Sequence, residues 1–374
     1  MAFENYYSDL PMDLSEKDLK ILIAMARSGG KISAEQLSTK LDISPRTVRY
    51  RLNRLRDLGY LRELYTMTHE RKLGMRHICL ILQENLEFGP IPMNLINSLF
   101  HISYLSPVYG CFNGWLMDFG VSVGRGNDAE KTCEILKDRG IVEDFFFYEV
   151  IDFHSFQPEL RYMNHDGLWD WTHETWISEI KQCLGGEHLV DLKFDKNPGI
   201  IKFDEIDVEL LTTIKMDARI SYTELGKKVD LSGTQVSNRL SRLEEEGIIK
   251  GYRLFFKEPI NPMVVYCFFH VRNKPDQVLS ALSHLPFPKE ILYGSGDVYA
   301  LRVRCYGDDA SEFLRGFHLL KPHLDWYKFG FAVSVSQGPI QYFKFLFDKE
   351  AGIVDSPIYD YEGIIDEFCK NNDC

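Results

Sequence analysis

Apolar residues recur with helical spacing in two stretches that lie far apart in the chain. The first stretch opens at Ser44, and its apolar residues Val48, Leu52 and Leu55 follow at i, i+4 and i+7. Such spacing is typical of a helix that buries one face. The second stretch opens at Ser232 and repeats the same spacing. A glycine closes each stretch, where the left-handed end of a helix favours that residue.

The two stretches belong to a longer internal repeat. Aligning residues 31–33 with residues 219–221 gives an offset of 188 residues, and this register continues from residue 31 to residue 79. Matched pairs outside the two helical stretches are Leu37 with Leu225, Leu41 with Val229, Ile43 with Leu231, Met75 with Met263, and Cys79 with Cys267. The chain is therefore predicted to contain two copies of one unit.

Each copy is predicted to begin with three helices. Apolar periodicity indicates a first helix at 18–26 and again at 207–214, with Ser15 and Asp204 available as N-caps. A short second helix is expected at 33–41 and 221–229, and the third opens at Ser44 and Ser232. Two short helices joined by a tight turn, the second of them amphipathic, predict a helix-turn-helix. The residues that follow, 60–67 and 248–256, are predicted to be strands of wing hairpins.

The pattern then changes to that of a sheet with helices between its strands. In the second copy, strands are expected at 264–271, 290–294, 298–306 and 326–335, and helices at 275–285 and 309–320. In the first copy, strands are expected at 77–84, 102–110, 115–124 and 142–151, and helices at 92–100 and 128–140. The order β-α-β-β-α-β is that of a ferredoxin-like domain. The predicted fold class is thus α+β, with two winged helix-turn-helix domains, each followed by a ferredoxin-like domain.

This order of elements divides the chain into six segments. Residues 153–202 form a connector, in which Trp169, Trp171 and Trp176 are spaced for a helix that buries one side. Residues 339–374 are acidic and are expected to form one peripheral helix or to stay mobile. The other segments are the first winged helix-turn-helix at 12–75, the first ferredoxin-like domain at 76–152, the second winged helix-turn-helix at 203–262 and the second ferredoxin-like domain at 263–338.

The charge of the chain is unevenly distributed. The net charge of −12 and the pI near 5.5 argue against nucleic-acid binding when they are taken alone, because phosphate neutralisation needs clustered lysine and arginine. Residues 15–76, however, hold 14 basic and 7 acidic residues, whereas residues 143–197 hold 4 basic and 12 acidic ones. The acidity therefore lies outside the first helix-turn-helix, and the objection is weakened.

Composition places the chain among folded proteins of a reducing compartment. Hydrophobic residues make up 45% and charged residues 26% of the chain. No apolar run reaches the ~18 residues that a membrane-spanning helix needs, so a membrane is not an expected partner. The eight cysteines include no C-x-x-C pair, and Cys79 and Cys267 lie in apolar runs that predict burial. The expected location is cytoplasmic.

The two segments SPRTVRYRLNRLRDLGYL (44–61) and SGTQVSNRLSRLEEEGII (232–249), each followed by the βαββαβ pattern, carry a family resemblance. The chain resembles the leucine-responsive/AsnC (feast–famine) transcription regulators. The resemblance implies that the ferredoxin-like domains are sensing domains, that double-stranded DNA is a partner, and that a small effector such as an amino acid binds. Family members usually carry one unit per chain and dimerise; this chain fuses two, and a homodimer of fused chains stays an open alternative.

The third helix of the first copy carries the candidate DNA-binding residues. A recognition helix presents its outward, N-terminal residues to base edges and phosphates. An arginine there can bind guanine with two hydrogen bonds or contact a phosphate, and an asparagine can pair with adenine. The alternative is an arginine-rich solvated face on a helix that docks to protein. The candidates are Ser44, Arg46, Thr47, Arg49, Tyr50, Asn53 and Arg54.

The third helix of the second copy is expected to contribute less electrostatic affinity. Residues 202–258 hold 10 basic and 11 acidic residues, and the helix ends in Glu244, Glu245 and Glu246. Its polar residues remain suited to reading bases, so this copy is predicted to add selectivity or architecture, and a purely structural winged helix is the alternative. The candidates are Ser232, Thr234, Gln235, Ser237, Asn238 and Arg242.

The family resemblance places the effector near the loop between the second and third strands of each sensing domain. Glycines in these loops permit close backbone approach and leave amides free. A tight hairpin turn is the competing interpretation. The candidate effector-binding residues are Gly110, Asn113 and Gly114 in the first copy and Gly294, Ser295, Gly296 and Asp297 in the second.

Catalytic and metal-binding patterns are weak in this sequence. The connector residues His165, His173, Cys183 and His188 do not match a zinc-site spacing, so no metal, cofactor or catalytic residue is predicted. An enzymatic rival remains, because siroheme decarboxylases resemble these regulators; its candidates are His101, His270 and Arg302. A protein-interaction scaffold is the third hypothesis.

Overall fold

The computed structural model describes residues 14–162, 170–256, 263–305, 309–333, 344, 346–350, 352–355 and 360–372. Trp169 and His165 lie outside these described residues. So do residues 12–13, residues 257–262 at the end of the predicted second winged helix, and residues 334–338 at the end of the predicted second sensing domain.

Each copy begins with a three-helix head, as predicted. The first head holds α1 (Glu16–Arg27), α2 (Ala34–Leu41) and α3 (Pro45–Asp57). The second holds α7 (Glu205–Met216), α8 (Tyr222–Val229) and α9 (Gly233–Glu245). The serines predicted as N-caps accept backbone hydrogen bonds at the starts of α1, α2, α3, α8 and α9, and Asp204 does the same for α7. The apolar spacing read from the sequence is buried in both heads: Val48, Leu52 and Leu55 in α3, and Val236, Leu240 and Leu243 in α9.

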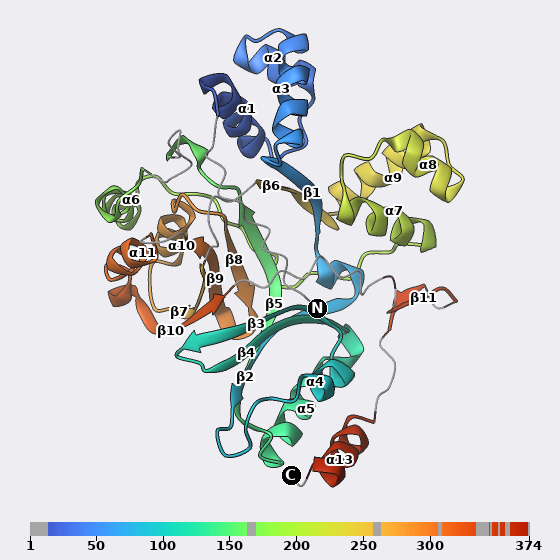
Figure 1. Ribbon diagram of the computed structural model, residues 1–374, viewed down its shortest axis with the longest axis vertical. Helices are drawn as coiled ribbons and strands as arrows, with labels where there is room; N and C mark the ends of the chain where they lie inside the picture. Colours follow the sequence, from blue (N-terminus) through green and yellow to red (C-terminus); the bar gives the residue numbers. More distant parts are fainter. Residues whose placement is uncertain are drawn as a thin grey trace.

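The strand after each head departs from the prediction of a wing hairpin. β1 (Leu61–Thr68) and β6 (Ile249–Phe256) pair with each other in an antiparallel two-stranded sheet, with Leu64 opposite Leu254. Among the described residues, each copy supplies one strand to this sheet, and that strand forms its backbone hydrogen bonds with the equivalent strand of the other copy. The two heads are therefore joined by a shared ribbon, which Figure 1 shows between the blue and the yellow helices.

The predicted βαββαβ order occurs in both copies. The first unit comprises β2 (Met75–Glu84), α4 (Met93–Leu99), β3 (Ile102–Gly110), β4 (Gly114–Ser122), α5 (Gly126–Asp138) and β5 (Val142–Phe156). The second comprises β7 (Met263–Val271), α10 (Pro275–Ser283), β8 (Lys289–Gly294), β9 (Val298–Cys305), α11 (Asp309–Phe317) and β10 (Leu324–Val333). The fold class predicted from the sequence is confirmed.

The two sheets close on each other into a barrel. β5 runs past its own sheet, so that Phe153 to Phe156 pair with β8, and β10 pairs with β3 through Gly330 opposite Gly110. The result is a closed eight-stranded barrel with the order β10-β3-β4-β2-β5-β8-β9-β7. Cys79, Tyr266 and Phe268 belong to the apolar cluster shared by both sheets, and α4 and α5 cover one sheet while α10 and α11 cover the other (Figure 1).

The connector and the tail are partly built into the fold. α6 (His173–Gly185) packs on α10 and α11, and Trp176 is fully buried with its indole N–H donating to the carbonyl of Ala281 at 2.8 Å. Trp171 is buried just before this helix rather than on it. In the acidic tail, α13 (Tyr361–Asn372) packs on α4 and α5, and the short strands β11 (Phe347–Asp348) and β12 (Ile353–Val354) lie against the second head.

Within the described ranges, no helix combines the length and the apolar character needed to cross a membrane.

Candidate nucleic-acid interface

A buried carboxylate fixes the recognition helix of the first head. Asp18 of α1 is fully buried and accepts hydrogen bonds from Arg51 at 2.9 Å and Arg54 at 2.8 Å, both on α3. It also accepts from the backbone N–H and the hydroxyl of Ser15. Burial works against ionisation, but these hydrogen bonds outweigh it and lower the pKa of Asp18 below its ordinary value. The carboxylate therefore holds α3 against α1.

The second head repeats this arrangement. Asp207 of α7 is buried and accepts hydrogen bonds from Arg239 at 2.8 Å and from Arg242, both on α9. Arg54 and Arg242, predicted from the sequence as outward DNA contacts, are therefore turned toward the first helix of their own head. The physical reason is helical spacing: a residue three positions after Arg51 or Arg239 lies on the same side of the helix.

The remaining candidates on α3 form an exposed face. Arg46, Arg49, Tyr50 and Asn53 are exposed, and the side chain of Tyr50 is 67% exposed. Arg49 forms an ion pair with the exposed Glu35 of α2, whereas Arg46 has no ion-pair partner among the described residues. Ser44 caps the helix and hydrogen-bonds the hydroxyl of Thr47 at 2.8 Å. The face combines two arginines, a phenol and an amide at the N-terminal part of the helix.

The corresponding face of α9 is neutral. Thr234, Asn238 and Ser241 are exposed, while Ser237 is half-buried. Ser232 caps the helix, and the side-chain oxygen of Gln235 accepts the backbone N–H of Ser232 at 2.9 Å. Gln235 is therefore engaged in a capping box rather than left free to contact a base.

The two predicted effector loops lie at opposite joints of the barrel. The loop at 110–114 contacts β10, where the N–H of Cys111 donates to the carbonyl of Phe329 at 2.9 Å. The loop at 294–297 contains η4 (Ser295–Asp297), and Asp297 pairs with Lys196 of the connector at 2.8 Å. The structure thus does not bring the two loops together.

Strand packing accounts for two of the loop glycines. A Cβ on Gly114 would lie 2.0 Å from the carbonyl oxygen of Leu82, and one on Gly294 would lie 2.7 Å from that of Glu149. Both positions need glycine because neighbouring strands approach closely. Gly110 and Gly296 have positive φ values of 116° and 71°, which fits the hairpin-turn interpretation as well. Asn113 uses its carbonyl to accept the N–H of Glu84.

One predicted loop nevertheless borders a cavity. A cavity of about 250 Å³ reaches Ser295 and Val298 and is also lined by Arg76, Glu130 and Glu149. Arg76 pairs with Glu149 at 2.5 Å, and Glu149 also pairs with Arg71, which lies in η1 (Glu70–Leu73) directly after β1. The cavity therefore contacts an ionic chain that leads to the strand joining the heads.

Further buried charges connect the barrel to the shared ribbon. Arg253 of β6 pairs with Glu290 of β8 at 2.5 Å, and Lys250 of β6 pairs with Asp152 of β5. Glu290 also binds Arg302. This network was not predicted from the sequence. The sequence feature that could have indicated it is the occurrence of charged residues among apolar neighbours within the strands.

The network continues into the barrel through a histidine. Arg302 pairs with the buried Asp118 at 3.0 Å, and Asp118 faces the Nε2 of His77 at 3.7 Å. Burial opposes a charged imidazole, but the nearby carboxylate of Asp118 outweighs it and raises the pKa of His77. Because Arg302 is held by two carboxylates, it is not available as an isolated catalytic arginine.

The other enzymatic and metal candidates do not converge. His270 pairs with Asp325 at 2.7 Å at the end of β7, four residues beyond Tyr266, the residue opposite Arg302. His101 is exposed just before β3. Of the connector residues, Cys183 is buried in the apolar core that α6 covers, and His188 pairs with Glu179 at 3.0 Å.

His173 has a carboxylate at each ring nitrogen. Its Nδ1 hydrogen-bonds Glu312, and its Nε2 lies 3.2 Å from Glu174. One ring nitrogen of His173 and one carboxylate oxygen each of Glu174 and Glu312 lie within 4.8 Å of one another.

Known proteins match both heads of this chain, and two regulators match longer stretches of it. A family model described as winged helix-turn-helix DNA-binding matches residues 14–62 and 203–250. The leucine-responsive regulatory protein of Klebsiella pneumoniae is 35% identical over 140 residues, which cover 36% of this chain and 84% of that protein. The regulator LrpA of Pyrococcus horikoshii is 33% identical over 103 residues, covering 27% of this chain and 73% of that protein. This chain belongs to the leucine-responsive/AsnC family of DNA-binding transcription regulators.

This family member carries the duplicated head within one chain, and its whole architecture has a solved counterpart. The crystal structure of the siroheme decarboxylase NirDL superposes with a TM-score of 0.53 over 94% of this chain and 99% of that chain, at 11% identity. A likeness at that identity concerns the fold: two heads and two ferredoxin-like units in one continuous arrangement. The family resemblance inferred from the two recognition-helix segments is thus confirmed, together with the tandem duplication.

Proposed function

We propose that this chain reads a specific operator with two unequal heads, α3 supplying most of the phosphate attraction and α9 adding base selectivity. The observation that carries the proposal is the exposed face of α3, which presents Arg46, Arg49 and Tyr50 next to Asn53. Among the described residues, the only carboxylate paired with these arginines is that of Glu35. Glu35 is itself exposed, so a DNA phosphate can replace it as the partner of Arg49.

Rigidity of the recognition helix supports this assignment. Arg51 and Arg54 are held by Asp18, so the outward residues project from a helix whose orientation is fixed before DNA arrives. A preorganised helix loses less conformational entropy on binding, which favours affinity. The same reasoning applies to α9, where Arg239 and Arg242 are held by Asp207.

The neutral face of α9 suits base reading without strong phosphate attraction. The exposed residues Thr234, Asn238 and Ser241 on this face carry no charge. An asparagine can bind adenine through two hydrogen bonds, and hydroxyls can contact several bases. We therefore assign Asn238 as the main selective contact of the second head.

A double substitution of Arg46→Ala and Arg49→Ala tests this proposal. Each lost phosphate contact should reduce the slope of log affinity against log salt by about 0.9, so the double variant should lose about two from the slope and bind at least tenfold more weakly at moderate salt. The measurement is fluorescence anisotropy of duplexes selected from a random pool on the unaltered protein, titrated at several salt concentrations.

The matched control is Lys131→Ala with Lys137→Ala on α5, which removes the same charge far from the heads (Figure 1). This control should leave the salt slope unchanged. An Arg46/Arg49 variant that binds the selected duplexes with an unaltered slope would refute the assignment of α3.

Effector control is proposed at the cavity beside Ser295. The cavity presents Arg76, which can bind a carboxylate, and Glu130 and Glu149, which can bind an ammonium group. An amino acid there would compete with Glu149 for Arg76, and Glu149 is tied to Arg71 beside β1. Ligand binding would thus alter an ion pair that supports the strand joining the heads.

Thermal-shift measurements with each standard amino acid test this effector site. At least one amino acid should raise the melting temperature of the unaltered protein, and Arg76→Gln should abolish that rise. The exposed Arg272→Gln serves as the control and should keep it. If the rise persists in Arg76→Gln, the effector binds elsewhere.

The siroheme hypothesis has support from the fold alone. The siroheme decarboxylase NirDL shares the architecture, but here Arg302 is neutralised by Asp118 and Glu290 and His270 is paired with Asp325. Mixing the protein with siroheme and recording absorbance and carbon dioxide release would decide the matter, since an unchanged spectrum rejects the enzymatic function.

A further inference from the structure

A second cavity lies between the two heads. Its volume is about 500 Å³, and it is lined by residues 30–33 of the first copy and residues 218–221 of the second. These two segments are equivalent at the offset of 188 residues. β1 and β6 contribute Leu64 and Leu254, which lie opposite each other in the shared ribbon. The cavity is therefore a product of the pairing of the two copies and has no counterpart within one unit.

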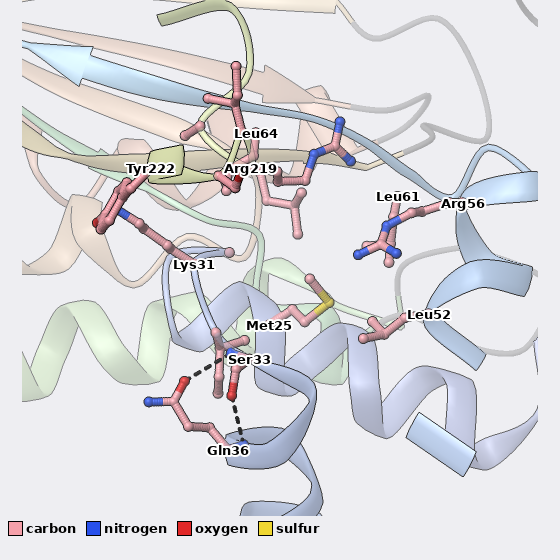
Figure 2. A pocket seen from close by; sticks show the side chains of 16 residues that line it. Met25, Lys31, Ser33, Gln36, Leu52, Arg56, Leu61, Leu64, Arg219 and Tyr222 are labelled. Carbon is pink, nitrogen blue, oxygen red and sulfur yellow. Dashed lines mark hydrogen bonds between the residues drawn. The ribbon is translucent and has the colours of Figure 1, made fainter. Parts of the chain in front are cut away.

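The cavity combines an apolar interior with cationic ends. Met25 and Leu52 extend along one side in Figure 2, with Leu64 facing them, while Lys31 and Arg56 lie toward opposite ends and Arg219 above. A volume of this size suits a small organic ligand. Because all three charged side chains on the lining are positive, the complementary ligand is an anion with an apolar body.

Arg56 is the least neutralised of these cations. Its guanidinium donates to the side chain of Asn53 at 3.0 Å, and no carboxylate forms an ion pair with it among the described residues. Partial desolvation and the nearby guanidinium of Arg219 lower the pKa of Arg56. Two guanidinium groups from different heads therefore line the same space; Asp217 offsets part of their charge, and an anion in the cavity would offset the rest.

The other two cations already have oxygen partners. Arg219 binds Asp217 at 2.8 Å and donates to the carbonyl of Arg62 at 3.1 Å. Lys31 donates to the hydroxyl of Tyr252 at 2.7 Å and lies 3.7 Å from the carboxylate of Glu244. Both retain further donors, because a guanidinium has five N–H groups and an ammonium has three.

The two heads are fastened to the ribbon unequally around this cavity. On the second head, the N–H of Ala218 donates to the carbonyl of Leu64 at 2.7 Å, and Thr66 donates to the carbonyl of Ile214 at 2.8 Å. The equivalent turn of the first head approaches β6 through Gly30, where a Cβ would lie 2.8 Å from the Cβ of Leu254. A ligand between the heads would add contacts mainly to the first head.

We propose that the cavity between the heads is a binding site for an apolar monocarboxylate, such as a medium-chain fatty acid. The carboxylate lies between Arg56 and Arg219, and the hydrocarbon body packs on Met25 and Leu64. Occupancy fixes the first head relative to the second. This site is separate from the Ser295 cavity in the barrel, and its existence does not depend on the proposed operator binding.

Isothermal titration of the full-length protein with decanoate, decanol and decylamine tests the proposal. Decanoate should bind saturably with one site per chain, at least tenfold tighter than decanol, and decylamine should not compete with it. Arg56→Gln should weaken decanoate binding at least tenfold while leaving the weak decanol binding unchanged, because the apolar interior remains.

Two further variants complete the test. Met25→Trp fills the interior and should abolish binding of both decanoate and decanol, whereas Lys137→Gln on α5 should bind like the unaltered protein. Circular dichroism melting confirms that each variant is folded. The proposal is overturned if decanoate fails to bind the unaltered protein, or if it binds equally well to the Arg56→Gln and Met25→Trp variants.

Discussion

Replacement of Lys289 by methionine should stabilise the protein. Lys289 is 2% exposed at the start of β8, where its ammonium nitrogen donates to the carbonyl of Leu285 and lies 4.8 Å from the ring centre of Phe156. Burial lowers the pKa of Lys289 from 10.5 to about 7. Methionine keeps the unbranched shape without a charge to bury, and we expect a gain of roughly 2–4 kcal/mol at neutral pH, given ~1.4 kcal/mol per pKa unit.

The expected gain in stability depends on pH, and the direction of this dependence can be tested. Between about pH 7 and pH 10.5 the unfolded chain binds more protons at this lysine than the folded protein does, so the unaltered protein becomes more stable as pH rises through this window. The advantage of Lys289→Met should therefore be largest at and below pH 7 and should shrink toward pH 10.5.

Urea unfolding followed by tryptophan fluorescence measures the effect, because Trp171 and Trp176 belong to the same apolar cluster as Leu285. The exposed Lys131→Met is the control, for which we expect a change within about 0.5 kcal/mol. A variant at Lys289 that is less stable than the unaltered protein at pH 7 would show that the contacts with Leu285 and Phe156 outweigh the cost of burying the amine.

Substitution of Asp18 by asparagine should loosen the first head. Asparagine has nearly the same size as aspartate but carries no charge. The guanidinium groups of Arg51 and Arg54 would therefore remain next to each other without a carboxylate between them. Breaking a buried ion pair typically costs about 3–5 kcal/mol; since both arginines reach solvent, we expect about 2–4 kcal/mol here. Hydrogen exchange followed by mass spectrometry should show faster exchange in α1 and α3.

The second head supplies the matched variant for this experiment. Asp207→Asn should accelerate exchange in α7 and α9 and leave the first head unchanged. Asp57→Asn, at the exposed end of α3, should change neither head. Since the pKa of Asp18 is lowered, its contribution is present above the ordinary value of 3.8 and is lost as pH falls through the lower folded value. Unchanged exchange in Asp18→Asn would show that packing alone positions α3.

Local sequence signals were sufficient for the heads and the strand order. Capping serines and the apolar residues Val48, Leu52 and Leu55 determine α3 through contacts within a few turns, so periodicity located it within one residue. The βαββαβ order could also be predicted, more clearly in the second copy than in the first, because alternation along a strand reflects which face it buries. The tryptophan helix was predicted less well, since Trp171 packs before α6 rather than on it.

These local signals could not show which strands pair with each other. The strand at 60–67 has the same local pattern whether its neighbour belongs to its own copy or to the other copy, and the choice depends on how the two units close into a barrel. The same limit applies to Arg54: the sequence places it on the polar side of α3, and only the position of Asp18 on another helix determines that it turns inward. The cavity between the heads could not be predicted for this reason too.

The shared ribbon has a consequence for the kind of DNA that this chain can recognise. Identical subunits related by a two-fold axis favour palindromic sites, but β1 and β6 join two heads of different composition in one polypeptide. If both heads contact DNA as proposed, the site has a polarity: one half would match the arginine-bearing head, and the other half would match the neutral one. Inverting such a site in front of a promoter would exchange the heads end for end and point the regulator in the opposite direction along the gene.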